Sequence, residues 1–443
     1  MEIYNFAKDY ASSEISRFHM PGHKGANLHG LESLDITEIK GADYLYSSSG
    51  IIAMSESKTA QAYGSALTCY STQGSTLSIN SALCILTRFF GRKITVASPR
   101  NCHRAFLNAC ALLDIEPVWL YPTNPPQSLC QSEITAEDLR SALSENKVDA
   151  VYITSPDYLG NITDIASISK VCREFGTFLI CDNAHGAYLK FLNPSIHPLD
   201  LGADIALDSA HKTLPVYTGG GYLHISKSAP KEFCELAKDS MALFGSTSPS
   251  YLIMQSLDLC ADSLLDDLPK KIRQCCKQTE KVKALMKELE IPDISKEPMK
   301  ITIDAEKIGF SGNELADEMR KLSMECEYSD HSYVVLMLSP YNSENDFARL
   351  ESFLTALKKR KPLSSEPTLF FSKKNQPQKC MSVRQAMLSK SKKTSVDDAE
   401  GKICAAHAVS CQPSVAVVIA GEKITSETIK ILKRYSIFQI DVL

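Results

Sequence analysis

Between about residue 94 and residue 226, short apolar runs alternate with longer amphipathic stretches. The apolar runs predict strands at residues 94–97, 117–120, 150–154, 177–181, 204–207 and 220–225. The amphipathic stretches predict helices at residues 103–113, 136–145 and 165–175. Thr135, followed three residues later by Asp138, predicts a capping pair at the start of the second of these helices. This alternation predicts an α/β fold with a largely parallel sheet covered by helices on both faces.

The rest of the pattern divides the chain into five parts, which are an N-terminal segment (residues 1–40), a large domain containing the sheet (41–260), a small αβ domain (261–361), a linker (362–378) and a C-terminal domain (379–443). The small αβ domain is predicted from a helical region at 254–290, strands at 300–304 and 333–338, and helices at 313–322 and 344–361. The linker is rich in proline, serine and lysine. The C-terminal domain is expected to hold a helix, an apolar strand and a final helix starting near Thr425.

The composition narrows the class of protein. The 443 residues are 44% hydrophobic and 23% charged, which is ordinary for a globular protein and excludes a disordered, collagenous or coiled-coil chain. The 48 basic and 52 acidic residues nearly balance, so the overall charge does not favour nucleic acid or a membrane surface as a partner. The apolar run at residues 415–420 is far shorter than the ~20 residues of a membrane span. Glu2, Lys8 and Asp9 do not fit the layout of a signal peptide.

Cysteine is unusually frequent. The chain has 15 cysteines, an odd number, and no two of them are spaced as a C-x-x-C pair. A zinc site or a disulfide framework would show regular spacing. We therefore expect reduced and mostly buried thiols in a cytoplasmic protein, and no metal site.

Four loop segments carry residues suited to chemistry, and the first is Thr-Gln-Gly-Ser-Thr at residues 72–76. It precedes a helical run at residues 77–90, so the hydroxyls of Ser75 and Thr76 meet free backbone N–H groups at a helix N-terminus. Such a site suits a phosphate group. A simple Ser/Thr N-cap is the alternative.

The second and third segments follow predicted strands. Asp182 opens Asp-Asn-Ala-His-Gly at the end of one strand, where a carboxylate can hold a protonated ring nitrogen or cap the next turn. Lys212 lies in Asp-Ser-Ala-His-Lys-Thr after the next strand. Burial there favours a neutral, nucleophilic amine, which makes Lys212 a candidate Schiff-base former. The alternative is a surface lysine whose stem covers a loop.

The fourth segment, Asn-Cys-His-Arg at residues 101–104, places His103 at a predicted helix start. The histidine is either a cap or a flat surface that stacks on an aromatic ligand. Together the four segments describe a ligand with a phosphate, a basic ring nitrogen, an aldehyde and a flat face. Pyridoxal 5′-phosphate has all four, and proteins bind it through a lysine and an acidic residue at the ring nitrogen.

Further motifs extend this interpretation over nearly the whole chain, and they are Phe-His-Met-Pro-Gly-His-Lys-Gly at 18–25, Asp-Ile-Thr-Glu at 35–38, Ser-Thr-Ser-Pro-Ser-Tyr at 246–251, Met-Ser-Val-Arg at 381–384 and Gly-Glu-Lys-Ile-Thr at 421–425. In this order they resemble the Orn/Lys/Arg decarboxylase family in its short form, without the extra N-terminal domain. The resemblance implies a fold-type I (aspartate aminotransferase-like) large domain with a mostly parallel sheet, plus small αβ and C-terminal domains.

The resemblance also implies roles for individual residues. Lys212 forms the Schiff base, Asp182 pairs with the pyridine nitrogen, His103 stacks on the ring, and Lys212 or His185 reprotonates Cα. The phosphate and the opposite ring face are contacted by Ser75, Thr76, Ser209, His211 and Ala184. The reaction implied is decarboxylation of arginine, lysine or ornithine to the amine, a lyase activity that belongs to polyamine biosynthesis. A homodimer is implied, with residues 247–250 reaching the partner's cofactor and residues 21–25 near the entrance.

Departures from the family pattern cluster where the substrate should bind. The family's Asp-Glu-Ala-His-Gly-Ala-His run has Asn183 and Tyr188 here in place of the glutamate and the last histidine, and its Thr-Tyr-Tyr-Gly run reads Asp-Tyr-Leu-Gly at residues 157–160. An Ala-Glu pair is replaced by Ala405 and Ala406, and a Tyr-Pro-Pro-Gly-Ile-Pro turn by residues 411–416.

The missing acid at Ala406 removes a charge-assisted contact with a basic substrate that is worth roughly 2–5 kcal/mol in comparable interfaces. Two alternatives to the basic amino-acid decarboxylase therefore stay open. One is an enzyme with an altered substrate or reaction, such as an aminotransferase or another lyase. The other is a cofactor-binding protein with little catalysis. Glu422 and Asp157 are candidates to replace the missing acid.

Overall fold

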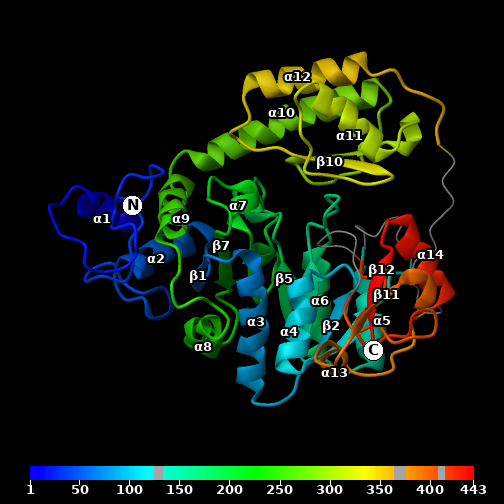
Figure 1. Cartoon of the computed structure of the whole chain (residues 1–443), viewed down its shortest axis with the longest axis horizontal. Helices are drawn as coiled ribbons and strands as arrows, with labels where there is room; N and C mark the ends of the chain where they lie inside the picture. Colours follow the sequence, from blue (N-terminus) through cyan, green and yellow to red (C-terminus); the bar gives the residue numbers. More distant parts are fainter. Residues whose placement is uncertain (124–132, 364–375, 408–414) are drawn as a thin grey trace. The chain divides into compact units, whose positions relative to one another are not determined.

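The computed structural model describes residues 1–123, 133–363, 376–407 and 415–443. The chain forms two compact units, whose helices and strands are labelled in Figure 1. Unit 1 comprises Met1–Val96, Val148–Ile153 and Ile165–Lys270, and unit 2 comprises Ala97–Lys147, Thr154–Asp164 and Lys271–Leu443. The division into parts 1–40, 41–260, 261–361, 362–378 and 379–443 stays a prediction, and residues 364–375 of the expected linker lie outside the described residues.

A seven-stranded sheet has the order β1-β7-β6-β5-β4-β2-β3. Its strands are β1 (Leu67–Ser71), β2 (Thr95–Pro99), β3 (Glu116–Leu120), β4 (Ala150–Thr154), β5 (Phe178–Asp182), β6 (Ile205–Asp208) and β7 (Gly221–Ile225). β5 and β6 are parallel, whereas β7 runs antiparallel to both β6 and β1. The carboxyl ends of β5 and β6 therefore lie side by side at one edge of the sheet.

The helices of unit 1 are α1 (Glu2–Ala11), α2 (Ile51–Tyr63), α3 (Gly74–Phe90), α6 (Ile165–Phe175), α7 (Ala210–Thr213), α8 (Lys231–Ala242) and α9 (Tyr251–Leu264), with 3-10 turns η1 (Leu45–Ser47), η2 (Ala187–Phe191) and η3 (Pro198–Leu201). α3 packs against α8 and against β6 and β7. Ser78, Ile79 and Leu83 of α3 are buried there. This packing fixes the N-terminus of α3 beside the strand ends that carry the candidate site.

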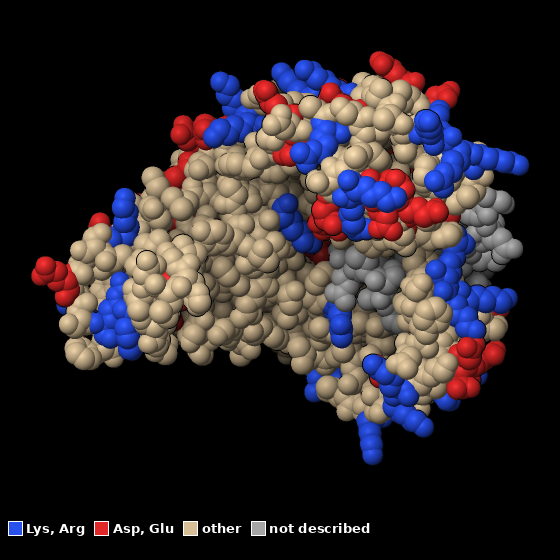
Figure 2. All heavy atoms as spheres, turned by 45° about the horizontal axis from the view of Figure 1, so that its top comes forward, with Lys and Arg blue, Asp and Glu red and all other residues tan. Residues whose placement is uncertain are grey.

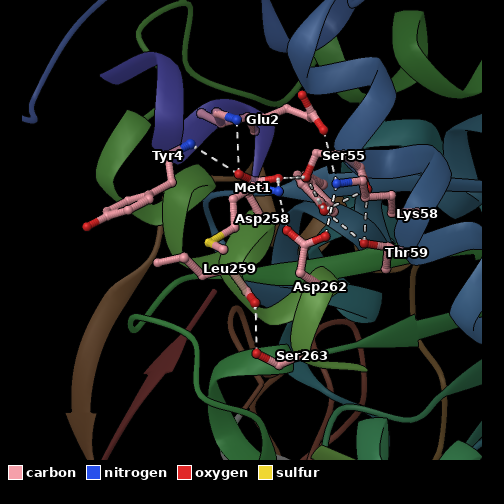
Figure 3. Close-up of polar contacts among 12 residues, drawn as sticks. Met1, Glu2, Tyr4, Ser55, Lys58, Thr59, Asp258, Leu259, Asp262 and Ser263 are labelled. Atoms are coloured by element: carbon pink, nitrogen blue, oxygen red, sulfur yellow. Dashed lines mark hydrogen bonds and ion pairs between the residues drawn. The ribbon is translucent and has the colours of Figure 1, made fainter. Parts of the chain in front are cut away.

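Asp258 of α9 joins the N-terminal helix to the rest of unit 1 (Figure 3). Its carboxylate is fully buried, and Oδ2 accepts the backbone N–H groups of Ile3 (2.9 Å) and Tyr4 (3.1 Å). Oδ1 accepts the Ser55 hydroxyl of α2 at 2.6 Å. An acidic side chain at these N–H groups satisfies donors that have no partner within the helix. α1, α2 and α9 consequently pack as one group.

The helices of unit 2 are α4 (Arg104–Leu113), α5 (Ala136–Glu145), most of α10 (Leu268–Glu288), α11 (Gly312–Lys321), α12 (Glu344–Ala356), α13 (Val383–Met387) and α14 (Ser426–Arg434), with 3-10 turns η4 (Glu306–Ile308) and η5 (Val396–Asp398). One small sheet has the order β8 (Lys300–Asp304), β10 (Tyr333–Met337), β9 (Tyr328–Ser329), and another pairs β11 (Lys392–Ser395) with β12 (Gln439–Val442). α13 packs against α4.

The α/β alternation predicted from the sequence is confirmed. Each predicted strand between residues 94 and 226 occurs with its ends shifted by two residues at most, and the helices at 136–145 and 165–175 have the predicted bounds. The Thr135 and Asp138 pair forms a capping box, in which each side chain bonds the other residue's backbone N–H. Thr425 caps the last helix, as expected.

The helical region predicted at residues 254–290 is confirmed and consists of two helices, α9 and α10. Two other predictions of secondary structure were wrong. The helix expected at 344–361 ends at Ala356. The apolar run at 415–420 is buried but forms no strand, because it packs as a loop into the core around α14 and β12 instead of pairing along its length.

Candidate active site

Asp182 ends β5 and is held in a fixed orientation. Its Oδ2 accepts the hydroxyl of Tyr152 at 2.8 Å, and its Oδ1 accepts the backbone N–H of Ala184 at 3.3 Å. Both Asp182 and Tyr152 are buried, at 1% and 0% exposure. Two donors on different oxygens leave the carboxylate little freedom to rotate. Tyr152 was missed by the sequence reasoning, because its position inside the apolar strand Ala150–Thr154 indicates burial but not which carboxylate it contacts.

Lys212 and His185 meet at the same edge of the sheet. Lys212 lies in the short helix α7 after β6, and its Nζ is 2.9 Å from Nε2 of His185 in the loop after β5. His185 is buried, whereas Lys212 is partly exposed. One nitrogen donates and the other accepts, so a proton is shared between the candidate nucleophile and the imidazole. Two residues of the predicted catalytic set are thus in direct contact.

Three of the predicted phosphate-binding residues come together at the N-terminus of α3. The N–H of Ser75 donates to Oγ of Ser209 at 3.3 Å. Nδ1 of His211 is 2.9 Å from the carbonyl of Gly220, and its ring lies next to Gly74, where a Cβ would be 3.7 Å from Cε1. Thr76 follows Ser75 in the first turn of α3 and is exposed.

Two glycines let the backbone at the start of α3 lie close to the backbone of the neighbouring strands. Gly74 has φ +62°, a left-handed conformation that favours glycine, and its N–H donates to the carbonyl of Gly219 at 2.6 Å. A Cβ on Gly221 would lie 2.8 Å from the Asp208 carbonyl oxygen and 3.1 Å from the Gly74 carbonyl carbon. A side chain at Gly221 would push the α3 N-terminus away from the strand ends, and one at Gly74 would strain its left-handed backbone. The result is a cradle of N–H and hydroxyl groups of the kind that binds anions.

A buried polar cluster lies behind the Lys212 loop, at the end of β6. Asp208, His197 and His224 are fully buried, and Oδ2 of Asp208 is 3.2 Å from Nε2 of His197 and 3.4 Å from Nε2 of His224. Three such atoms could hold a metal ion. However, Nδ1 of His197 accepts the N–H of Leu199 at 3.3 Å, which leaves the hydrogen on Nε2 and makes that atom a donor instead of a metal ligand.

His103 lies in unit 2, where its backbone begins α4. Its Nδ1 accepts the N–H of Ala105 at 3.1 Å, so the ring acts as an N-cap. An N-cap was one of the two roles that the sequence predicted for His103. Its stacking on a cofactor stays a prediction.

Glu422, a candidate to replace the missing acid, is already paired. It binds Arg100 in a bidentate fashion, with N···O distances of 2.6 and 2.9 Å, and both side chains are buried. Arg100 also donates to the carbonyl of Ala416. Burial lowers the pKa of Arg100, but Glu422 outweighs it and raises that pKa above its usual value. The pair ties the loop at 415–422 to the end of β2.

Asp157, the other candidate, is also enclosed within unit 2. Its oxygens accept the backbone and side-chain N–H groups of Asn161, both at 2.9 Å, and the residue is 3% exposed. Burial raises the pKa of Asp157 to about 6, although the Asn161 hydrogen bonds act in the opposite direction. Two other residues that depart from the family pattern are Ala405, which is buried, and Ala406, whose carbonyl accepts a hydrogen bond from Sγ of Cys404. Residues 411–414, which also depart from that pattern, lie outside the described residues.

The residues fit pyridoxal 5′-phosphate. Within unit 1, a fixed carboxylate and a lysine amine follow the adjacent parallel strands β5 and β6, and a helix N-terminus suited to an anion follows β1. These are the groups that the cofactor's aldehyde, ring nitrogen and phosphate require. Ala184, which is 4% exposed, follows the carboxylate by two residues.

The fold defines the class. Solved structures with this fold include the lysine decarboxylase LdcF of Francisella novicida, with a TM-score of 0.77 and 17% identity over 100% of this chain and 81% of that chain. The constitutive lysine decarboxylase of E. coli has a TM-score of 0.75 and 15% identity over the same shares. The chain therefore has the fold of the fold-type I pyridoxal-phosphate-dependent enzymes.

The sequence comparison defines the family. Residues 2–296 match the profile of the Orn/Lys/Arg decarboxylase major domain. An uncharacterized protein of Bacillus subtilis, YaaO, is 29% identical over 98% of this chain and 93% of its own length, and an arginine decarboxylase of Bacillus subtilis is 25% identical over 96% and 92%. The chain belongs to the Orn/Lys/Arg decarboxylase family, and so to the pyridoxal-phosphate-dependent amino-acid decarboxylases.

Proposed function

We propose that this protein decarboxylates a basic amino acid, arginine, lysine or ornithine, with pyridoxal 5′-phosphate held by Lys212. The observation that carries the proposal is the contact of Lys212 with His185 at a strand end adjacent to the fixed carboxylate of Asp182. Similarity over nearly the whole chain to proteins named arginine decarboxylase supports the substrate class. An amine product of such a reaction would serve polyamine biosynthesis.

Each residue has a task in this proposal. The bound cofactor supplies an electron sink for the bond that breaks at Cα. Asp182 keeps the ring nitrogen protonated, and the hydrogen bond from Tyr152 holds the carboxylate in place for that purpose. His185 exchanges a proton with Nζ of Lys212, which lets the amine act as a nucleophile and afterwards as a proton donor.

Binding and orientation fall to the remaining predicted residues. Ser75, Thr76, Ser209 and His211 hold the phosphate at the N-terminus of α3. Ala184 contacts one face of the ring, and His103 stacks on the other. These roles come from the resemblance, and the contact of Ser75 with Ser209 and the position of His211 support them.

A specific observation favours a second candidate function. The acid expected at Ala406 is absent, and Glu422 and Asp157 both have their oxygens engaged within unit 2. Neither carboxylate is free to bind an ammonium or guanidinium group. A pyridoxal-phosphate enzyme with another substrate or reaction, or a cofactor-binding protein with little catalysis, is therefore the alternative.

We also propose a homodimer in which residues 247–250 reach the partner's site and residues 21–25 lie near the entrance. Figure 2 shows a broad surface of unit 1 without Lys, Arg, Asp or Glu. Phe18 and Leu243 are 95% and 67% exposed, which is unusual for large apolar side chains. Phe18→Glu should shift the mass measured by light scattering from dimer towards monomer, whereas the same mass as wild type would contradict this role.

The cellular compartment is part of the same proposal. No helix in the described ranges is long and apolar enough to cross a membrane. Of the thirteen cysteines described, nine are buried and all are free thiols. Reduced thiols support a cytoplasmic protein.

The test is CO2 release from arginine, lysine and ornithine, measured separately with added pyridoxal phosphate. Release from one of them that disappears in Lys212→Ala would support the decarboxylase and name its substrate. No release from any of the three, with the cofactor bound through Lys212, would contradict the decarboxylase and favour the second candidate.

A further inference from the structure

The side chain of Asn183 connects the two loops that carry the candidate catalytic residues. Its Nδ2 donates to Oδ1 of Asp208 at 2.7 Å, and its backbone N–H donates to the carbonyl of Leu207 at 2.9 Å. Asn183 directly follows Asp182 and lies two residues before His185. Asp208 lies four residues before Lys212. The hydrogen bond between the amide and the carboxylate therefore joins the ends of β5 and β6, from which the loops of His185 and Lys212 start.

Asp208 is an ionised carboxylate in this cluster. Burial raises its pKa, but the rings of His197 and His224 outweigh burial and hold the pKa well below its usual range. His197 donates from Nε2, because its Nδ1 accepts the N–H of Leu199. Burial lowers the pKa of His224, whose Nδ1 is 2.8 Å from Oγ1 of Thr68.

The two phenols beside the cluster add no charge to it. Tyr63 stacks on the His224 ring at 4.2 Å, and Tyr222 lies 5.3 Å from it. Burial raises the pKa of both phenols well above the usual value, so both stay neutral. Lys190 acts on His224 through its charge and is paired with Asp200, an acid that in turn interacts with the charge of His197. Asp208 is the acid of this group that contacts Asn183.

The amide of Asn183 is confined on its other side as well. A Cβ on Gly186 would lie 2.1 Å from Oδ1 of Asn183, so the side chain occupies the space that a larger residue at 186 would need. Nδ2 must face Asp208, since Oδ1 in that place would put two acceptors in contact. A neutral donor at residue 183 is therefore matched to one negative charge at residue 208.

We propose that Asn183 and Asp208 are positioning residues, which set the spacing between the loop of Asp182 and His185 and the loop of Lys212 by means of one amide and one carboxylate. This inference rests on the proposed function, because it concerns the residues that would hold the cofactor. A second acid at residue 183, which the family's Asp-Glu run has, would place two carboxyl groups in contact and require an extra proton.

Asn183→Asp tests the inference with almost no change in volume. In the folded variant, burial and Asp208 raise the pKa of the new carboxyl above its unfolded value. The variant keeps the native spacing at a pH below the raised folded pKa, where the new group is protonated in the folded protein. It loses that spacing as the pH rises through the raised folded pKa. Asn146→Asp is the matched control. It also removes an amide that donates one hydrogen bond, to the Ala142 carbonyl, but at the exposed end of α5 and away from any buried acid.

Two properties are measured from pH 5.5 to pH 8.5 (about three units), each relative to wild type: the affinity for pyridoxal phosphate and the melting temperature of the protein without cofactor. For Asn183→Asp, the affinity should fall at least about tenfold more at high pH than at low pH, one pKa unit being tenfold, and the melting temperature should fall in the same interval. Asn146→Asp should run parallel to wild type. The exchanged pair Asn183→Asp with Asp208→Asn restores one amide and one carboxylate, and should remove most of the pH dependence.

Several results would overturn the inference. A constant affinity ratio across the pH range, near one or uniformly low, would mean that residue 183 has no role in spacing the loops or only a general structural one. A pH-dependent melting temperature with a flat affinity ratio would restrict the cluster to stability. One equivalent of metal purifying with the wild-type protein and lost in Asp208→Asn would replace the hydrogen-bonded cluster by a metal site. If wild type does not bind pyridoxal phosphate at all, the proposed function fails first, and that outcome is distinguishable from the others.

Discussion

The buried Arg100–Glu422 pair gives a prediction whose size follows from the structure. Glu422→Gln keeps the volume of the side chain and one hydrogen-bond acceptor but removes its charge. Arg100 is 3% exposed and stays charged, so the substitution leaves an uncompensated guanidinium in the interior. Breaking a buried pair in this way costs about 3–5 kcal/mol. We expect unit 2 to lose that much unfolding free energy.

The loss should be local. Glu422 also accepts the N–H of Ile419, and Arg100 donates to the carbonyl of Ala416, so residues 415–422 depend on the pair. Hydrogen exchange read by mass spectrometry should show faster exchange in peptides covering these residues, and unchanged exchange in peptides of α2 and α9. Urea unfolding should report the free energy.

Asp397→Asn is the matched control for this prediction. It also neutralises an acid paired with a base, Lys433, but Asp397 is 68% exposed. Exposed pairs contribute about 0–1 kcal/mol. A Glu422→Gln protein that differs from wild type by less than about 1 kcal/mol, like the control, would refute the reasoning that the pair holds the C-terminal loop.

The remaining predictions concern three other carboxylate or lysine sites. Asp258→Ala removes the acceptor of two α1 N–H groups and of the Ser55 hydroxyl, and should lower the unfolding free energy by about 2–4 kcal/mol, measured by urea unfolding. Asp262, one turn further along α9, is partly exposed and pairs with Lys58, and a loss no larger than that of Asp262→Ala would contradict the prediction. Because the pKa of Asp157 is raised to about 6, the unfolding free energy should fall by about 3 kcal/mol as the pH rises from about 4 to 6. Asp157→Asn should remove that part of the pH dependence, and calorimetric curves that stay parallel to wild type would be evidence against it. Lys212→Ala should abolish the visible absorbance of lysine-bound cofactor without changing the far-ultraviolet circular dichroism.

The sequence predicted those parts of the fold that depend on local periodicity. The apolar runs between residues 94 and 226 became strands because each run is bounded by turns and followed by an amphipathic helix. β1 (Leu67–Ser71) was missed because Thr68, Cys69 and Ser71 give it neither an apolar run nor a clear alternation. The apolar run at residues 415–420 was wrongly predicted as a strand, because an apolar composition does not distinguish a buried strand from a buried loop.

The same limit applies to the candidate site. Lys212, Asp182 and His185 could be found because they follow predicted strands, and strand ends of a parallel sheet meet at one edge. The contact of Tyr152 with Asp182 and the cluster around Asp208 depend on which side chains of separate strands face each other. A single sequence does not contain that pairing. Likewise, Arg100 and Glu422 are more than three hundred residues apart, and only the fold brings them together.

The attachment of pyridoxal phosphate to Lys212 is the central claim, and reduction with borohydride tests it most directly. The reagent reduces a lysine–cofactor Schiff base to a stable amine, which peptide mass spectrometry locates in the chain. We predict a phosphopyridoxyl group on the peptide that contains Lys212, and none on that peptide in Lys212→Ala. A modification on a different lysine, or none in wild-type protein saturated with pyridoxal phosphate, would contradict the account.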